Sequence, residues 1–313
     1  MSGTAGSTPS GHGLRVLAET VHHLQCPHCG QTPAVEGEAL VCPRAHRFDL
    51  ARQGYVNLLR GDEHIGTADT ADMIGARTRF IAAGHLAGLR DAITARAAAT
   101  VSGAAGCLVE VGAGTGYHLA GLLDRLEGAM GLALDISKPA LRRAARAHRR
   151  MAALGCDVWG RLPIADGAAD LVLDIFAPRN APELQRILRP GGALVVVTPT
   201  SAHLTELVVG LGLVTVDARK QQRLSDALGS HFSRVEESLD EGPYVERLRL
   251  DHGAVADVAA MGPSARHVDR SELDRRIRGL PDPLEVTVSV SISVWRRPRR
   301  PVDRVYLEQE GGG

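Results

Sequence analysis

The sequence predicts an α/β protein: a doubly wound sheet with helices on both faces, preceded by a small metal-binding module. Apolar runs that end in turn residues alternate with helical patterns over much of the chain. One such run, Cys107 to Val111, breaks into alternating glycines and is followed at once by leucines at helical spacing. Three of the five cysteines lie between residues 26 and 42, far from this turn. These observations together predict two modules in one chain.

Composition excludes several classes of protein. The 313 residues carry a formal net charge of zero, so no overall attraction to nucleic acid or membrane is expected. Aromatic residues are 3%, which argues against an extended platform for stacking bases. No apolar run approaches the ~20 residues of a membrane span. Met1 to Gly13 lacks the basic start and apolar core of a signal peptide, and we expect a flexible tail. A cytoplasmic protein without a membrane partner fits these features best.

The cysteines follow a metal-binding pattern. Cys26 and Cys29 form one close pair, and Cys42 with His46 forms a second after twelve residues. Two such pairs on tight turns suit tetrahedral Zn²⁺, which we expect to be structural because protein side chains fill all four positions. A disulfide or a redox C-x-x-C explains the first pair but not the second. His28 could compete as a ligand, although a residue between two knuckle cysteines usually points away. Residues 35–41 are expected to form the hairpin between the pairs.

The segment between the metal-binding module and the glycine-rich turn predicts a connection and helices. Residues 61–72 are polar and lack an apolar period, as an exposed connection would. Residues 72–99 are helical in pattern, with an interruption at Gly84-His85 that predicts two helices or a kink.

The turn Gly112-Ala113-Gly114-Thr115-Gly116 has the spacing G-x-G-x-G, which differs from the dinucleotide fingerprint G-x-G-x-x-G. Alone it is evenly balanced between a cofactor loop and a simple turn from strand to helix. A second apolar run, from Met130 to Leu134, ends in Asp135, about 20 residues beyond the glycines. An acid at that place binds ribose hydroxyls in doubly wound folds. The glycine turn and Asp135 together therefore favour a cofactor that contains a nucleoside.

Later strand ends supply further candidates, with an ordinary turn as the alternative at each. Asp157 and Trp159 could hydrogen-bond to an adenine and stack on it. Phe176, Arg179 and Asn180 follow the apolar run 169–176, on the substrate side of such a sheet. His203 begins a later helix over the same edge. The arginines of the expected helix 140–150 favour a solvated face over an RNA-contacting one.

The last third is less regular. Residues 219–232 are helical in pattern, and residues 245–250 extended. Residues 286–295 alternate as a half-buried strand does. Residues 298–313 are expected to be a tail.

Four motifs resemble those of class I S-adenosylmethionine-dependent methyltransferases, which have a Rossmann-like fold. They are the E-x-G-x-G-x-G turn, the acid Asp135, the L-P-x-x-D-x-x-x-D-L-V segment from Leu162, and L-R-P-G-G before a strand. The knuckle and the run Gly54-Tyr55-Val56-Asn57-Leu58-Leu59 narrow the resemblance to 23S rRNA (guanine-N1)-methyltransferases of the RlmA type. The segments 51–59, 135–140 and 176–180 resemble most the actinobacterial macrolide-resistance members from tylosin and mycinamicin producers.

This resemblance implies methyl transfer from S-adenosylmethionine to N1 of a guanine in a 23S rRNA hairpin lining the peptide exit tunnel. It implies a homodimer whose zinc modules help to form an RNA cleft. The cofactor contacts of the family fall on Gly114, Thr115 and His203, and one that is aromatic in some relatives falls on Leu86. We expect Gly112 to shape the turn and Asp135 to bind the ribose. Asp174 or a water is expected to accept the N1 proton, and Arg44, Arg47 and Arg52 to contact phosphates.

The expected organisation is a tail at 1–20, a zinc ribbon that binds RNA at 21–60, a linker with helices at 61–106, and the methyltransferase domain at 107–297. Two rival functions remain open. A small-molecule methyltransferase explains the sheet but leaves the knuckle without a purpose. A zinc-ribbon scaffold with a degenerate sheet is hard to reconcile with the intact turn and Asp135.

Overall fold

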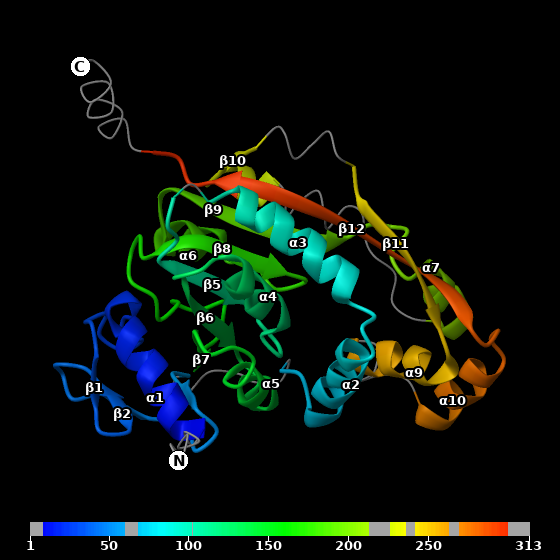
Figure 1. Ribbon diagram of the computed structural model, residues 1–313, viewed down its shortest axis with the longest axis horizontal. Coiled ribbons are helices and arrows are strands. Elements are labelled where there is room, and N and C mark those ends of the chain that lie inside the picture. Colours follow the sequence, from blue (N-terminus) through cyan, green and yellow to red (C-terminus); the bar gives the residue numbers. More distant parts are fainter. Residues whose placement is uncertain are drawn as a thin grey trace, which may run out of the picture.

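The structure is a computed structural model that describes residues 9–59, 68–101, 103–212, 226–235, 242–262 and 269–299. It contains one large sheet, a small three-stranded sheet at one end, and a helical lobe at the other (Figure 1). Within the described part, no helix is long and apolar enough to cross a membrane.

The large sheet has the order β10-β12-β9-β8-β5-β6-β7-β4, with β11 also paired to β12. Strands β4 to β9 are parallel to one another, and β9, β10 and β11 each pair antiparallel with β12. Their bounds are β4 Tyr55–Asn57, β5 Cys107–Val111, β6 Met130–Asp135, β7 Met151–Gly155, β8 Ala169–Ile175, β9 Leu188–Pro199, β10 Ser233–Arg234, β11 Tyr244–Leu250 and β12 Leu284–Arg296.

The small sheet contains β1 (Ala34–Glu36), β2 (Ala39–Val41) and β3 (Arg47–Asp49). The helices are α1 Pro9–Thr20, the 3₁₀ turn η1 Val21–His23, α2 Ala71–Ala82, α3 Ala87–Ala99, α4 Tyr117–Arg125, α5 Lys138–Ala144, α6 Ala181–Ile187, α7 Thr205–Leu211, α9 His252–Met261 and α10 Arg270–Arg278. The expected hairpin at 35–41 and the two helices between residues 72 and 99 are confirmed. So are the strands expected at 245–250 and 286–295.

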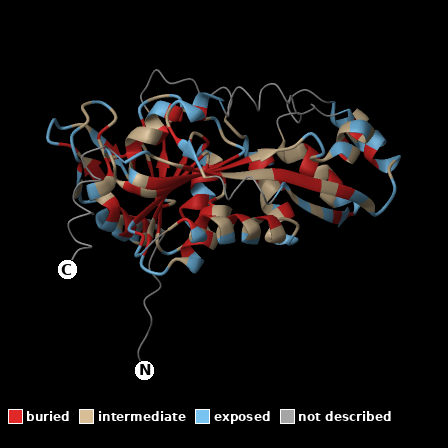
Figure 2. Ribbon diagram, turned by 90° about the horizontal axis from the view of Figure 1, so that it is seen from above, coloured by how far each residue is buried: buried red, intermediate tan, exposed pale blue. Residues whose placement is uncertain are grey.

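The central strands are buried on both faces, as parallel strands covered by helices must be (Figure 2). Leu108 of β5 points into a core built with α3 and α4, whereas Val109 and Val111 point into a core built with α1 and α6. This alternation follows from the two-residue period of a strand. It leaves the carboxyl ends of the parallel strands and the loops after them as the place for a ligand.

The amino-terminal segment corrects one expectation. Residues 9–20 form α1 and are not a flexible tail. Val16 and Leu17 are buried in the core shared by the zinc module and the sheet. Gly13 lies so close to Gly54 that a Cβ there would approach its carbonyl oxygen to 2.5 Å. A glycine-rich composition suggested a tail, but here glycine permits close helix packing.

The boundary expected at residue 60 does not separate two independent bodies. β4 lies within the expected zinc module, yet it pairs parallel with β7 at the edge of the large sheet. Leu24 also forms an isolated antiparallel β-bridge with Ile164, and the backbone N–H of Gln25 donates to Pro163 O at 3.0 Å. The zinc module is therefore fixed to the sheet by backbone hydrogen bonds.

Two expected helices differ in extent. The one expected over 140–150 ends at Ala144, because the chain must turn back into β7. Arg150 is not solvated: its guanidinium donates to the carbonyl oxygens of Leu126, Ala129 and Leu123 at the end of α4. Much of the helix expected over 219–232, and most of the connection 61–72, lies outside the described residues.

The packing of α1 against the core can be tested by mutation. Replacing the buried Leu17 by Ala should lower the free energy of unfolding by about 2–4 kcal/mol, because it removes methyl groups from a filled core. Replacing Glu19, which is exposed and paired with Arg15, should change it by less than about 0.5 kcal/mol. Urea unfolding of the two zinc-loaded variants measures both values. Equal stability of the two proteins would mean that α1 does not dock.

Candidate functional site

The glycine turn joins β5 to α4 at the carboxyl edge of the sheet. Gly112, Gly114 and Gly116 have φ angles of 61°, 55° and 76°, a region that favours glycine. A Cβ at Gly112 would lie 2.7 Å from the Cβ of Ala177, and one at Gly116 would lie 2.9 Å from Met151 Sδ. At Gly114 a Cβ would meet the guanidinium of Arg77, at 3.0 Å. The first and third glycines are thus needed for packing, while the space over the second is covered by the end of a flexible side chain.

Asp135 lies beside this turn, at the end of β6. Its Oδ2 accepts a hydrogen bond from Gly114 N at 2.7 Å, and its Oδ1 accepts one from Ser137 N at 2.8 Å. The residue is 9% exposed, and burial raises the pKa of its carboxyl although these two bonds oppose the shift. Each oxygen keeps a second lone pair for a further donor. The expected pairing of glycine turn and acid is therefore present in space.

Helix α2 covers the turn, which the sequence pattern did not indicate. Arg77 forms an ion pair with Asp69 at 2.8 Å and donates to Met261 O at 3.2 Å. Ser137 Oγ donates to Asp69 O at 2.7 Å, which ties the start of α5 to the same segment. Arg77 precedes the turn by many residues and has no local motif. Only the fold brings it there.

Glu110 was also missed as a site residue. It is 2% exposed, and its Oε2 accepts from Leu119 N at 3.1 Å inside the first turn of α4. Burial raises the pKa of its carboxyl to about 8. The E-x-G-x-G-x-G motif contained the signal, since an acid inside an otherwise apolar strand needs a buried donor.

Leu86 lies at the start of α3, half-buried against the core. Its carbonyl accepts from Arg90 N at 2.9 Å, and the guanidinium of Arg90 stands 5.2 Å from the ring centre of Tyr117. Tyr117 follows the glycine turn directly. The contact between Arg90 and Tyr117 places the first turn of α3 beside the start of α4.

Asp174 and Arg179 form a buried ion pair at the end of β8. Arg179 Nε lies 3.2 Å from Asp174 Oδ1, with the two side chains 7% and 0% exposed. Neither carboxylate oxygen makes a well-aligned hydrogen bond with a protein group in the described residues. Burial raises the pKa of Asp174 to about 7, although Arg179 acts against the shift. Because Asp174 pairs in register with Val111, it lies next to the glycine turn.

Phe176 and His203 meet over the same edge. Phe176 has a φ of 54°, rare for a residue with a side chain, and is 48% exposed. Its ring centre is 5.8 Å from that of His203. His203 Nδ1 accepts from Ser289 N at 3.2 Å, and burial lowers the pKa of the imidazole to about 4. An exposed aromatic ring on a strained backbone is typical of a functional position.

Asn180 lies just after β8, at the start of α6, and contacts the loop after β7. Its Nδ2 donates to the carbonyls of Val158, Trp159 and Gly160 at 3.1–3.2 Å. The NH₂ group of this amide therefore orders the loop after β7. The loop displays Trp159, which is 65% exposed, and Trp159 N donates to Asp157 Oδ1 at 3.0 Å.

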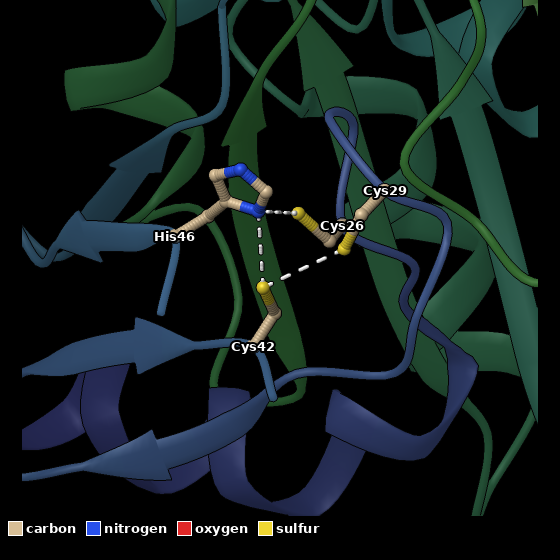
Figure 3. Close-up of side chains that lie close together, drawn as sticks. All are labelled: Cys26, Cys29, Cys42 and His46. Carbon is tan, nitrogen blue, oxygen red and sulfur yellow. Dashed lines mark hydrogen bonds between the residues drawn. The ribbon is translucent and has the colours of Figure 1, made fainter. Parts of the chain in front are cut away.

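The second site is a cluster of metal-binding side chains (Figure 3). The ligand atoms of Cys26, Cys29, Cys42 and His46 all lie within 4.8 Å of one another. Cys29 Sγ is 3.6 Å from Cys42 Sγ, and His46 Nδ1 is 3.2 Å from Cys42 Sγ. A tetrahedral Zn²⁺ with bonds of about 2.3 Å separates its sulfur ligands by about 3.8 Å. The cluster thus fits zinc, with no position left for water.

His28 is excluded from this cluster. Its ring stacks on Phe48, with centres 5.8 Å apart, and lies 4.8 Å from the ring of His46. Arg44, Arg47 and Arg52 are exposed on the same module, and Arg47 pairs with Asp49 at 2.9 Å.

Comparisons with known proteins agree with both sites. The family model described as "RlmA, N-terminal", a zinc ribbon, matches residues 24–61, and the one described as "Methyltransferase domain" matches residues 108–192. The chain is 50% identical over 278 residues to the 23S rRNA (guanine(748)-N(1))-methyltransferase of Streptomyces fradiae, covering 88% of this chain and 97% of that protein. The chain belongs to the 23S rRNA (guanine-N1)-methyltransferase family.

A second relative supports the assignment. The putative 23S rRNA (guanine-N(1)-)-methyltransferase of Micromonospora griseorubida is 47% identical over 292 residues, with 88% of this chain and 97% of that protein covered. The resemblance inferred from the motifs is thereby confirmed, as are the fold class and the methyltransferase activity. The cofactors that fit are S-adenosylmethionine at the glycine turn and structural Zn²⁺ at the cysteine cluster. The scaffold with a degenerate sheet is ruled out.

The zinc cluster yields a matched pair of variants. Cys29→Ser should lose bound zinc, because an alcohol is a far weaker ligand than a thiolate. His28→Ala should keep about one zinc per chain, since the imidazole of His28 is not a ligand. Elemental analysis of each purified, dialysed variant measures its zinc content per chain. Loss of zinc from the His28 variant, or its retention in the Cys29 variant, would contradict the ligand assignment.

Proposed function

We propose that this enzyme transfers a methyl group from S-adenosylmethionine to N1 of one guanine in a 23S rRNA hairpin at the peptide exit tunnel. The observation that carries the proposal is the presence, in one chain, of a complete donor turn and a complete zinc cluster, each matched by its family model. The near full-length identity to relatives named for that reaction supports it.

At the donor turn, Gly114 and Thr115 would contact the cofactor through the backbone, and Gly112 would hold the turn open. Asp135 would accept from the ribose hydroxyls with its remaining lone pairs. His203 and Leu86 would border the site. Asp157 and Trp159, on the loop that Asn180 orders, would bind the adenine by a hydrogen bond and by stacking. S-adenosylmethionine supplies an electrophilic methyl group, so the protein's main task is alignment.

The acceptor nitrogen carries a proton that must leave as the new bond forms. We assign its acceptance to Asp174, a positioned carboxylate whose pKa is raised to about 7, close to the working pH of a general base. Arg179 would hold this carboxylate. Phe176 offers an exposed ring on which the guanine can stack.

The zinc module gives the reason to prefer RNA over a small molecule as the substrate. Its exposed Arg44, Arg47 and Arg52 would contact phosphates, and β4 fixes them relative to the donor turn. A homodimer would combine two such modules into one RNA cleft. Methylation in the tunnel of a cytoplasmic ribosome would confer resistance to macrolides of the tylosin and mycinamicin kind.

The substrate is tested directly. Purified enzyme with S-adenosylmethionine labelled in the methyl group should label protein-free 23S rRNA. Primer extension should then stop at a single guanine, because N1-methylation blocks base pairing. Heat-denatured enzyme is the control. Label that enters small molecules but not rRNA would overturn the proposal in favour of the small-molecule alternative.

The proton acceptor is tested by a pH profile. Only the ionised carboxylate of Asp174 can accept a proton, so kcat/KM should rise with pH up to about 7 and level off above it. Asp174→Asn should lower kcat by about 10²- to 10⁴-fold and remove this rise. The affinity for S-adenosylmethionine, measured by calorimetry, should stay within the same range. A variant that keeps the wild-type profile would exclude Asp174 as the base.

A further inference from the structure

The edge of the large sheet opposite the glycine turn carries a pocket with a volume of about 450 Å³. β9 begins there, and β12, which runs antiparallel to β9, ends there beside β10 (Figure 1). This pocket, here called the basic pocket, is lined by Arg189, Gly191, Ser233, Arg296, Arg297, Pro298 and Arg299. Neither the donor turn nor the zinc cluster contributes to it.

Positive charge dominates the basic pocket. None of the described residues that line it is acidic. Arg189 donates to Asp170 Oδ1 at 2.5 Å. The other oxygen of Asp170 accepts from the backbone N–H groups of Gly106 and Cys107, so this carboxylate is shared between the arginine and the backbone. Burial and the nearby charges of Arg189 and Arg299 lower the pKa of Arg296, which shows how crowded the cations are. The whole chain is neutral, so this accumulation is local.

Two of the guanidiniums are held in place by the backbone. Arg296 donates to Gly191 O at 3.1 Å and to Thr100 O at 2.7 Å. Arg297 donates to the carbonyls of Arg186 and Leu188. Side chains fixed in advance lose little conformational entropy when a ligand binds. The pocket therefore has the rigidity of a preformed site.

Gly191 keeps the pocket open. Its φ is 77°, and a Cβ at this position would lie 3.1 Å from Arg299 Nε. Arg299 itself is exposed at the rim, so its guanidinium is available to a ligand from solvent. A guanidinium fork matches the oxygens of a phosphate. The chemistry of the pocket is thus that of a phosphate site.

We propose that the basic pocket binds a backbone phosphate of the RNA substrate, away from the guanine that is methylated; this rests on the proposed function. β9 separates the pocket from the donor edge by ~20 Å, at about 3.3 Å per residue. This distance is too long for the phosphate of the methylated guanine itself, so the phosphate belongs to a flanking part of the hairpin. An RNA held at both edges would be fixed in orientation across the sheet.

Arg299→Ala tests this contact. RNA affinity, measured by filter binding of the 23S hairpin transcript, should fall several-fold at low salt. The slope of log K against log salt should become shallower by about 0.7–0.9, the loss expected for one phosphate. Arg125→Ala is the control: Arg125 is exposed at the end of α4, on the same edge but outside the pocket. Ser233→Asp, which adds a negative charge at the rim, should act in the same direction as Arg299→Ala.

The alternative source of the phosphate is a small free anion. Inorganic phosphate is titrated against wild type and Arg299→Ala by calorimetry. If phosphate binds to the pocket but the salt slope for RNA is unchanged in Arg299→Ala, the site serves free anions and the proposal is overturned. Equal losses in Arg125→Ala and Arg299→Ala overturn it as well. Methylation of rRNA by the wild type is scored separately, so failure of the pocket is distinguishable from failure of the proposed function.

Discussion

The buried carboxylate of Asp135 is the interaction on which the donor side of the molecule depends. It accepts from the backbone of the glycine turn and from the start of α5, and so locks two strand-to-helix connections together. The backbone adds a bond between Ala113 N and Leu134 O beside it. Ser137 then binds Asp69, which holds Arg77 over the turn. These linked contacts hold the turn in a conformation that favours glycine.

A second constraint fixes the zinc module to the methyltransferase domain. Four zinc ligands supply the folding energy that so small a module lacks. β4 continues the chain of this module and becomes the outermost strand next to β7, whose neighbour β6 ends in Asp135. The position of the zinc module and the position of the donor turn are thereby set by the same sheet. The backbone pairing of β4 with β7 thus joins the two sites rigidly through the sheet.

Features that depend on residues close together in the sequence could be predicted. Features that depend on contacts between distant segments could not. Two features depend on residues that are neighbours in the sequence: the zinc knuckle, and the unit of strand, glycine turn and helix around Gly114. Their patterns could therefore be recognised from the sequence. α1 was missed because its glycine favours a tail by composition, while the deciding contact with Gly54 is distant in sequence. Arg77 and the arginines of the basic pocket have no local motif. The place of Asn180 after a strand likewise did not indicate the carbonyls to which its amide donates.

The formal net charge of the chain is zero, but its charged side chains are distributed unevenly between the two edges of the sheet. At the carboxyl edge, Asp135 and Asp174 are buried beside the turn, with Asp174 paired with Arg179. Burial raises the pKa of Glu110 to about 8, so this third acid is mostly protonated near neutral pH. At the amino edge, the arginines of the basic pocket suit a polyanion. The acids at the carboxyl edge are thus protonated, hydrogen-bonded or paired with arginine locally, whereas none of the described residues that line the pocket at the amino edge is acidic. A chain with a formal net charge of zero can therefore still present a local basic surface that would attract an anion.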